Sequence, residues 1–184
     1  TLTAAGLPPG VVSGGSTPAA WRMHEVAGLT EVRPGTYVYN DRATAAVGAC
    51  EWDECALTVL ATVVSTAVPG QAVIDAGSKA LGREPMDPSR APGADPAATA
   101  GFGALLDHPE VVVVRMSEEH GILDVSRSDW QPAVGDQVRV VPNHVCIVVH
   151  LNDVVYGVRE SGVVETRWPV AARGRVAPDA VPAW

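Results

Sequence analysis

The sequence predicts a mainly β protein with some α-helix, built as an antiparallel β-barrel or sandwich. Short apolar, β-branched segments recur along the chain with turns between them, which is the pattern of antiparallel sheets. Hydrophobic residues make up 47% of the 184 residues and charged residues 18%, so the chain can bury a sizeable core. The 18 glycines and 15 prolines supply the many turns that this architecture needs.

The N-terminal region contains two candidate segments. Val11 and Val12 form a short strand that runs into Gly14-Gly15-Ser16-Thr17-Pro18, where a proline after Ser-Thr indicates a helix start. Such a turn presents backbone N–H groups and two hydroxyls to an anion, although an ordinary capped turn explains the pattern alone more simply. Residues 36–39 then resemble a strand, with Tyr37 and Tyr39 on one face.

From about residue 56 onward, strands and turns alternate. The expected strands are 57–66, 72–75, 111–117, 121–125, 137–141, 144–151, 154–159 and 163–166. Several prolines predict an irregular surface loop over 83–101, and the tail beyond Ala177 is expected to be loosely held. A hairpin is expected between 144–151 and 154–159, with its bend at Leu151-Asn152-Asp153.

Charge and cysteine content narrow the function classes. The formal net charge is −8 and the pI about 5.0 with no basic cluster, which argues against a nucleic-acid partner. The sparse cysteines form no disulfide framework and fit a reducing compartment; Cys50 and Cys55 are interpreted as ordinary helix cysteines. No apolar stretch reaches the ~18 residues of a membrane helix, and the first residues do not resemble a signal peptide. We therefore expect a soluble, cytoplasmic protein without membrane contact.

The most informative segment is Pro142-Asn143-His144-Val145-Cys146, inside the apolar run 138–151 that predicts a strand. Successive side chains of a strand alternate faces, so His144 and Cys146 would point the same way. An imidazole and a thiol side by side suit Zn²⁺ or a similar cation, and two protein ligands leave positions open for chemistry. The spacing alone is weak evidence, because histidine and cysteine in an apolar segment are more often core residues.

Six motifs stand in a characteristic order along the chain. They are Gly14-Gly15-Ser16-Thr17-Pro18, 30–41, 73–81, Ser117-Glu118-Glu119-His120-Gly121, Pro142-Asn143-His144-Val145-Cys146 and 168–174. Together they resemble the C-terminal half of the D-serine dehydratase and D-threonine aldolase family, pyridoxal phosphate (PLP) enzymes of the alanine-racemase fold type. The resemblance covers residues 11–176. It implies that 1–35 is the remnant of a PLP-binding (β/α)₈ barrel and that 36–184 is a C-terminal metal-binding β domain.

The resemblance also implies roles for individual residues. The implied PLP-binding residues are Gly14, Gly15, Ser16, Thr17 and Tyr39. His144 and Cys146 match the family's metal pair, with zinc as the expected metal and another divalent ion such as manganese as the alternative. Glu119 and His120 follow a predicted strand and are candidate catalytic residues, with turn capping as the equally weighted alternative.

The implied reaction is D-serine dehydration to a keto acid and ammonia, which the cysteine of the metal pair favours. Retro-aldol cleavage, as in D-threonine aldolase, is the alternative within the family, and a non-catalytic β-barrel binding module is the alternative outside it. The PLP lysine of such enzymes lies near the start of the barrel, whereas Lys79, the only lysine here, lies in the β domain. We therefore expect a fragment, inactive alone, that needs the missing N-terminal barrel half and forms a homodimer acting on a D-amino acid.

Overall fold

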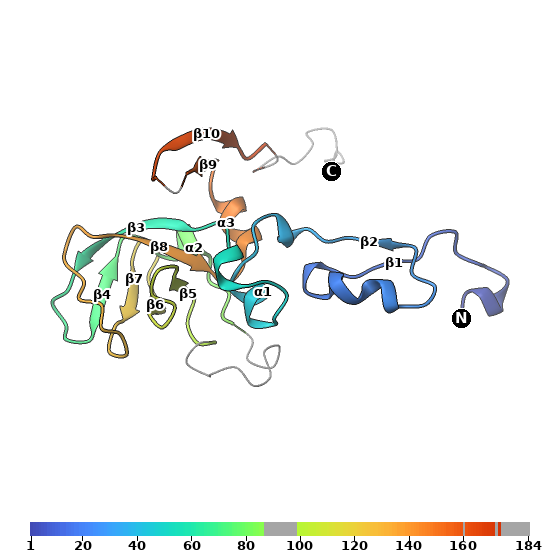
Figure 1. The fold of residues 1–184 in the computed structure, drawn as a ribbon, viewed down its shortest axis with the longest axis horizontal. Coiled ribbons are helices and arrows are strands. Elements are labelled where there is room, and N and C mark those ends of the chain that lie inside the picture. Colours follow the sequence, from blue (N-terminus) through green and yellow to red (C-terminus); the bar gives the residue numbers. More distant parts are fainter. Residues whose placement is uncertain (87–98, 160, 172, 174–184) are drawn as a thin grey trace, which may run out of the picture.

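A computed structural model describes residues 1–86, 99–159, 161–171 and 173 (Figure 1). Its centre is a closed antiparallel barrel with the strand order β3–β4–β7–β6–β5–β8. The strands are β3 (Val59–Ser65), β4 (Gln71–Ile74), β5 (Gly103–Leu105), β6 (Val112–Met116), β7 (Gly121–Asp124) and β8 (Gln137–Pro142). The prediction of a mainly β protein with an antiparallel barrel is confirmed, and the short β5 is a strand that the sequence pattern missed.

The barrel interior holds the main core. Along β4 and β7, half-buried and buried residues alternate, as expected for strands with one face inward. The largest fully buried side chains of this interior include Val63, Ile74, Leu105, Leu123 and Val140. Each contributes roughly 1.5–3 kcal/mol by leaving water, so this layer is the main source of the domain's stability.

Short helices lie beside the barrel and in the N-terminal segment. They are α1 (Arg42–Ala46), α2 (Ser78–Leu81) and α3 (Val145–Leu151), with 3₁₀ helices η1 (Thr3–Ala5), η2 (Thr17–Glu25), η3 (Thr36–Val38) and η4 (Trp52–Glu54). No helix of the described segments is long and apolar enough to cross a membrane. The strand predicted over 36–39 is wrong, because Thr36–Val38 form the 3₁₀ helix η3.

The N-terminal segment extends away from the barrel (Figure 1). Its β1 (Ser13–Gly14) pairs in parallel with β2 (Glu31–Val32), and η2 connects the two. Within residues 1–40 only Thr17 is buried. This strand–helix–strand unit is too short to establish a (β/α)₈ barrel, so that part of the fold prediction is not shown.

The strand predicted over 144–151 is wrong, because β8 ends at Pro142 and the chain continues as α3. Three valines and an isoleucine gave this segment strand propensity. Tertiary packing overrides it: Val145, Val148 and Val149 lie at helical spacing and pack against Leu57. The backbone N–H of Val145 also finds its acceptor far away in sequence, on Asp41.

Two smaller predictions are also wrong. The hairpin forms between β9 (Val154–Val158) and β10 (Val164–Pro169), and not between 144–151 and 154–159. Cys50 lies in a bend after α1, and Cys55 ends η4, so neither is an α-helical cysteine. Most of the loop predicted over 83–101 and the tail beyond Ala177 lie outside the described residues.

Candidate functional site

A cavity of about 590 Å³ lies where the N-terminal segment, α1 and the β8–α3 corner meet. The corner is the turn formed by Asn143, His144 and Val145. The polar residues that line the cavity are Ser16, Thr36, Asp41, Thr44, Glu84, Asn143 and His144. The cavity thus brings together one residue of the predicted phosphate loop, Ser16, and one of the predicted metal pair, His144.

The loop Gly14–Thr17 joins β1 to η2. Gly15 has a φ of 81°, in the left-handed region that favours glycine, and a Cβ there would lie 2.6 Å from the sulfur of Met23, whose side chain would have to move. Ser16 precedes η2, and its side chain makes no capping hydrogen bond. The Thr17 hydroxyl accepts hydrogen bonds from the amides of Gly35 (3.1 Å) and Tyr37 (3.0 Å). Of these loop residues, Ser16 alone lines the cavity.

Tyr39, the other predicted PLP contact, packs against α3. Its ring lies with Val59, Val149 and Val155 around the cluster of Leu57, Val145 and Val148. Tyr39 is not among the residues that line the cavity. Its contact with a phosphate therefore stays a prediction, while its packing gives it a structural role.

His144 and Cys146 do not lie on one face of a strand as predicted, because Val145–Leu151 form the helix α3. His144 is the residue before α3, with extended dihedrals (φ −138°, ψ 106°), and its side chain is 41% exposed. Cys146 lies in the first turn of α3 and is exposed, but it does not line the cavity. Within the described part of the chain, no group of three His, Cys, Asp or Glu side chains could hold a metal. Imidazole and thiolate are zinc ligands, so a metal held by this pair would keep open positions.

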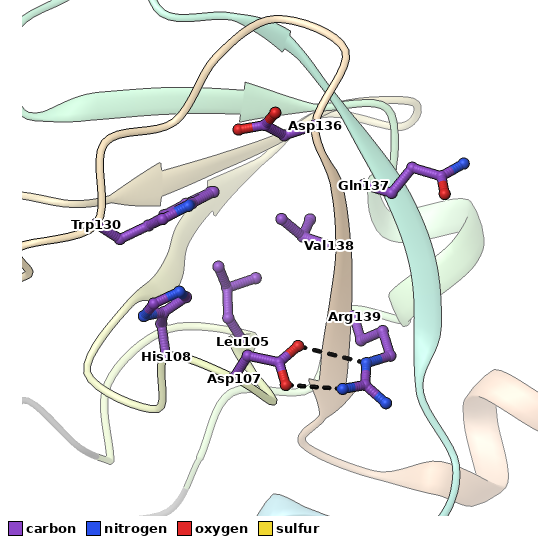
Figure 2. A pocket seen from close by; sticks show the side chains of 8 residues that line it. All are labelled: Leu105, Asp107, His108, Trp130, Asp136, Gln137, Val138 and Arg139. Carbon is purple, nitrogen blue, oxygen red and sulfur yellow. Dashed lines mark hydrogen bonds and ion pairs between the residues drawn. The ribbon is translucent and has the colours of Figure 1, made fainter. Parts of the chain in front are cut away.

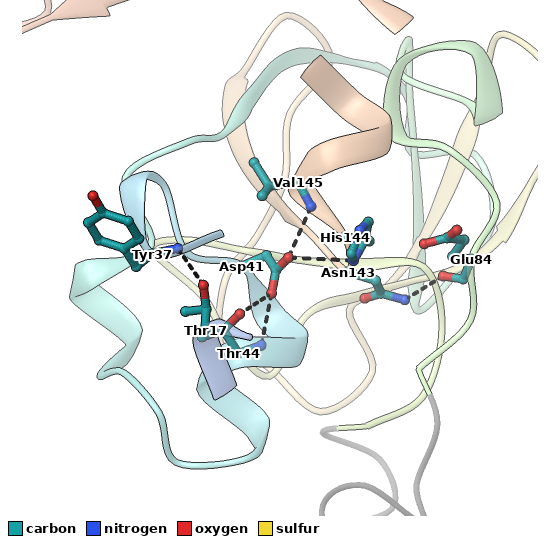
Figure 3. A network of polar contacts seen from close by, with 8 residues as sticks. All are labelled: Thr17, Tyr37, Asp41, Thr44, Glu84, Asn143, His144 and Val145. Atoms are coloured by element: carbon teal, nitrogen blue, oxygen red, sulfur yellow. Dashed lines mark hydrogen bonds and ion pairs between the residues drawn. The ribbon is translucent and has the colours of Figure 1, made fainter. Parts of the chain in front are cut away.

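Behind the corner lies a buried polar network that sequence reasoning missed (Figure 3). The Asp41 carboxylate accepts hydrogen bonds from the Thr44 amide (2.8 Å), the Thr44 hydroxyl (2.7 Å) and the Val145 amide (3.0 Å). Nδ1 of His144 lies 3.8 Å from Oδ2 of Asp41. The available signal was the capping pattern Asp41-Arg42-Ala43-Thr44, which marks a helix start.

Arg42 and Asn143 form the second half of this network. The buried Arg42 guanidinium donates to Oδ1 of Asn143 (3.0 Å) and to the carbonyl of Ala100 (2.7 Å). Burial lowers the pKa of Arg42 to about 10, so this side chain remains charged at neutral pH. The Asn143 amide group donates to the carbonyls of Glu84 and Gly101, each at 2.9 Å. The position of the corner is therefore fixed by hydrogen bonds to three separate segments.

The predicted catalytic pair, Glu119 and His120, lies in the turn between β6 and β7. The His120 amide donates to the Ser117 hydroxyl (3.1 Å), which is a turn-capping contact. Glu119 pairs with Lys79 at 2.6 Å. Neither residue lines the cavity that contains His144. These contacts favour the turn-capping interpretation, and a catalytic role stays a prediction.

A second, smaller hollow of about 180 Å³ lies on the barrel wall (Figure 2). His108 stacks on Trp130, with ring centroids 5.3 Å apart and an angle of 18° between the rings. Arg139 forms a two-point ion pair with Asp107 on the opposite side. None of the predicted site residues lines this hollow.

More than half of the chain matches a known protein family. Residues 56–158 match the model of the putative serine dehydratase domain. The D-threo-3-hydroxyaspartate dehydratase of Delftia sp. (strain HT23) is 37% identical over 159 residues, which are 79% of this chain and 40% of that enzyme. An uncharacterized protein of Mycobacterium tuberculosis is 38% identical over 133 residues, which are 70% of this chain and 92% of that protein.

Solved structures agree with the sequence comparison. The crystal structure of D-threonine aldolase from Filomicrobium marinum superposes with a TM-score of 0.72 at 32% identity, over 94% of this chain and 44% of that one. The chain thus spans less than half of the enzymes it matches. Two similar structures are variants of D-threo-3-hydroxyaspartate dehydratase in which a histidine or a cysteine, two positions apart, is replaced by alanine, and the cysteine variant is in a metal-free form.

Proposed function

Because the chain belongs to the family of putative serine dehydratase domains, we propose that it is the C-terminal β domain of a PLP- and metal-dependent lyase acting on β-hydroxy D-amino acids. We propose dehydration of D-serine or a close analogue as the reaction. The two matched enzymes of this type, a dehydratase and an aldolase, are covered over 40% and 44% of their lengths. The proposal therefore concerns the longer protein that contains the barrel half.

One observation carries this proposal: the cavity is lined both by Ser16, from the predicted phosphate loop, and by His144, from the predicted metal pair. These residues lie 128 positions apart in the sequence, and the fold brings them to one cavity. The spacing of His144 and Cys146 also equals that of the histidine and cysteine replaced in the variant structures of D-threo-3-hydroxyaspartate dehydratase. Support thus comes from geometry and from the comparison independently.

The residues of this chain would bind and orient the reacting groups. The Ser16 hydroxyl makes no capping hydrogen bond and can donate a hydrogen bond to a phosphate at the cavity wall. His144 and Cys146 would hold the metal beside the substrate's β-hydroxyl. When bound, PLP supplies an electron sink for the α-carbanion, and the metal supplies Lewis acidity that makes the β-hydroxyl a better leaving group.

The chain does not itself supply the lysine that such chemistry requires. Lys79 is its only lysine, and its ammonium group pairs with Glu119 (2.6 Å) and Glu118 (3.0 Å). The hydrogen bond that Lys79 donates to Glu119, followed by the one it donates to Glu118, raises the pKa of Lys79 and stabilises the protonated form. Lys79 does not line the cavity that contains Ser16 and His144, so we assign the PLP lysine to the barrel half of the proposed longer protein. We assign the expected dimer contacts to that longer protein as well.

Zinc binding by the purified chain tests the metal site. After equilibrium dialysis against ZnCl₂, elemental analysis should find about one zinc per chain, because an imidazole and a thiolate bind zinc well. The double variant His144→Ala, Cys146→Ala should lose this zinc, and the matched control His108→Ala, Cys50→Ala should keep it. Equal zinc content in the wild type and the His144, Cys146 double variant would remove the metal site from the proposal.

The reaction type is tested with the protein encoded by the complete reading frame. Supplied with PLP, zinc and D-serine, it should release a keto acid and ammonia, whereas the chain of 184 residues alone should release neither. Formation of glycine and an aldehyde from D-threonine, without keto acid from D-serine, would replace dehydration by retro-aldol cleavage.

A free-standing binding module is the second candidate. It is favoured by the mycobacterial relative, because 92% of that protein matches this chain and a domain of this extent therefore exists there as a separate protein. This alternative predicts a stable monomer without PLP absorbance at any cofactor concentration. Our proposal instead expects association through exposed apolar residues of the N-terminal segment, such as Leu7, Val11 and Trp21, and sedimentation velocity distinguishes the two.

A further inference from the structure

The Asp41 carboxylate is buried and its two oxygens have different tasks. Its side chain is 1% exposed, and Oδ1 accepts both hydrogen bonds from Thr44. Oδ2 accepts a hydrogen bond from the Val145 amide at 3.0 Å and faces Nδ1 of His144 at 3.8 Å (Figure 3). A carboxylate held in this way cannot turn away, so Oδ2 presents a fixed negative charge to the imidazole.

The imidazole is also held close to Oδ2 by the backbone around it. The Ala43 amide donates to the Asn143 carbonyl at 3.3 Å, and Arg42 donates to the Asn143 side chain at 3.0 Å. Residues 41–43 therefore run along the corner and bind it before and after His144. The distance of 3.8 Å is that of a contact and not of a hydrogen bond, so donation from Nδ1 requires the imidazole to move closer to Oδ2.

We propose that Asp41 is a positioning residue for His144: it keeps the proton of the neutral imidazole on Nδ1 and so leaves the Nε2 lone pair for a ligand in the cavity. Each neutral imidazole nitrogen is either a donor or an acceptor, and the partner of one nitrogen decides the state of the other. Histidines that bind metals commonly donate their second N–H to a carboxylate. The proposal deepens the proposed function and rests on it for the identity of the ligand.

Asp41 itself is not suited to be a ligand. Both of its oxygens already accept hydrogen bonds, and it is almost fully buried, so an approaching cation would have to displace the Thr44 or Val145 donors. The same donors satisfy both oxygens of the carboxylate without a cation. The geometry therefore separates the two tasks: His144 binds and Asp41 orients.

The tautomer of His144 in the metal-free chain tests the proposal directly. Long-range ¹H–¹⁵N spectra of the histidine-labelled chain, recorded at a pH where the imidazoles are neutral, distinguish Nδ1–H from Nε2–H. The wild type should show His144 as the Nδ1–H tautomer. A predominantly Nε2–H form in the wild type would overturn the proposal without any variant.

Two variants separate orientation from structure. Asp41→Asn replaces the carboxylate by a neutral amide and puts an NH₂ group at one of the two oxygen positions, so the preference for Nδ1–H should weaken and the Nε2–H fraction of His144 should rise. Thr44→Val removes one hydrogen bond to Oδ1 and leaves Oδ2 untouched, so it should keep the wild-type tautomer. Glu110→Gln beside His108 is the matched control at the other histidine and should leave His144 unchanged. An unchanged tautomer in Asp41→Asn would overturn the proposal.

Zinc titration of the same proteins distinguishes this proposal from the proposed function. Loss of an orienting partner typically costs 10–100-fold in metal affinity, so Asp41→Asn should bind Zn²⁺ about 10–100-fold more weakly and Thr44→Val about as well as the wild type. Equal affinity of Asp41→Asn and the wild type would contradict the positioning role. If no protein binds zinc but the tautomer changes as expected, the positioning role holds and the metal assignment fails.

Discussion

Among the described residues, His144 and His108 each line a cavity and lie close to a carboxylate, at nearly the same distance. Nδ1 of His144 lies 3.8 Å from Asp41, and Nδ1 of His108 lies 3.7 Å from Glu110. The two imidazoles are also similarly exposed, at 41% and 37%. The carboxylates differ: the Asp41 side chain is 1% exposed and that of Glu110 is 40% exposed.

The difference shows that the support behind a contact matters more than its length. Asp41 is held by two amides and a hydroxyl, so its charge is fixed beside His144. Glu110 accepts a hydrogen bond from the Ser128 hydroxyl and is otherwise open to solvent, which screens its attraction for His108. The His108 ring is instead held by stacking on Trp130. The hydrogen bonds to Asp41 thus fix the carboxylate beside His144, whereas stacking on Trp130 fixes the ring of His108.

The largest effect expected from this comparison is on stability. Asp41→Ala removes a helix-capping side chain, worth about 1 kcal/mol, and leaves the buried Val145 amide without its acceptor, worth about 1–3 kcal/mol. We expect the free energy of unfolding to fall by about 3 kcal/mol in urea denaturation. Glu110→Ala should change it by about 0.5 kcal/mol or less, because surface substitutions seldom cost more. Equal losses in the two variants would refute the distinction between them.

The barrel could be predicted from sequence because its signal is local. Alternation along segments such as β4 and β7 records which face is buried, and turns separate the strands. The same reasoning failed at α3, because the features that make this segment a helix are not local. Leu57 supplies its packing surface and Asp41 supplies the acceptor for its first amide, and both lie far away in sequence.

The residues of the candidate site also fall into two groups: those that the sequence identifies and those that only the fold reveals. His144 was found because histidine and cysteine are recognisable metal ligands, and Ser16 because its loop has a known capping pattern. Asp41 and Arg42 were missed, since an aspartate before a helix looks like an ordinary cap, and nothing in the sequence shows that its second oxygen serves another segment. Buried polar residues of this kind become visible only when the chain is folded.

A second prediction concerns the rings themselves. His108→Ala removes the stacking contact with Trp130, and such a pair is worth about 0.5–1.5 kcal/mol, so the free energy of unfolding should fall by about 1 kcal/mol. His144→Ala removes a half-exposed side chain without a stacking partner and should cost less, while it abolishes the expected zinc binding. Thermal and urea denaturation measure the first effect. A greater loss in His144→Ala than in His108→Ala would show that the imidazole of His144 contributes to the fold of the corner.

The smallest expected effect tests how weakly Glu110 is held. The Ser128 hydroxyl is the main cause that lowers the pKa of Glu110 below its usual value of 4.5. A carboxyl whose pKa is lower in the folded state stabilises the fold above the unfolded-state pKa, and this contribution is lost as the pH falls through the folded-state value. Ser128→Ala should therefore raise the pKa of Glu110 towards 4.5, as measured by NMR titration of its side-chain carboxyl carbon.

The accompanying change in stability should be about 0.5 kcal/mol or less at neutral pH, because Glu110 is largely solvated. This difference between the wild type and Ser128→Ala should shrink as the pH falls below about 4.5 and through the lower pKa that Glu110 has in the folded wild type. Urea denaturation at pH 7 and pH 3.5 measures both values. A difference that is large and independent of pH would mean that Ser128 supports this turn through contacts other than Glu110, and the β5–β6 turn would then resemble the Asp41 network more closely than its solvent exposure suggests.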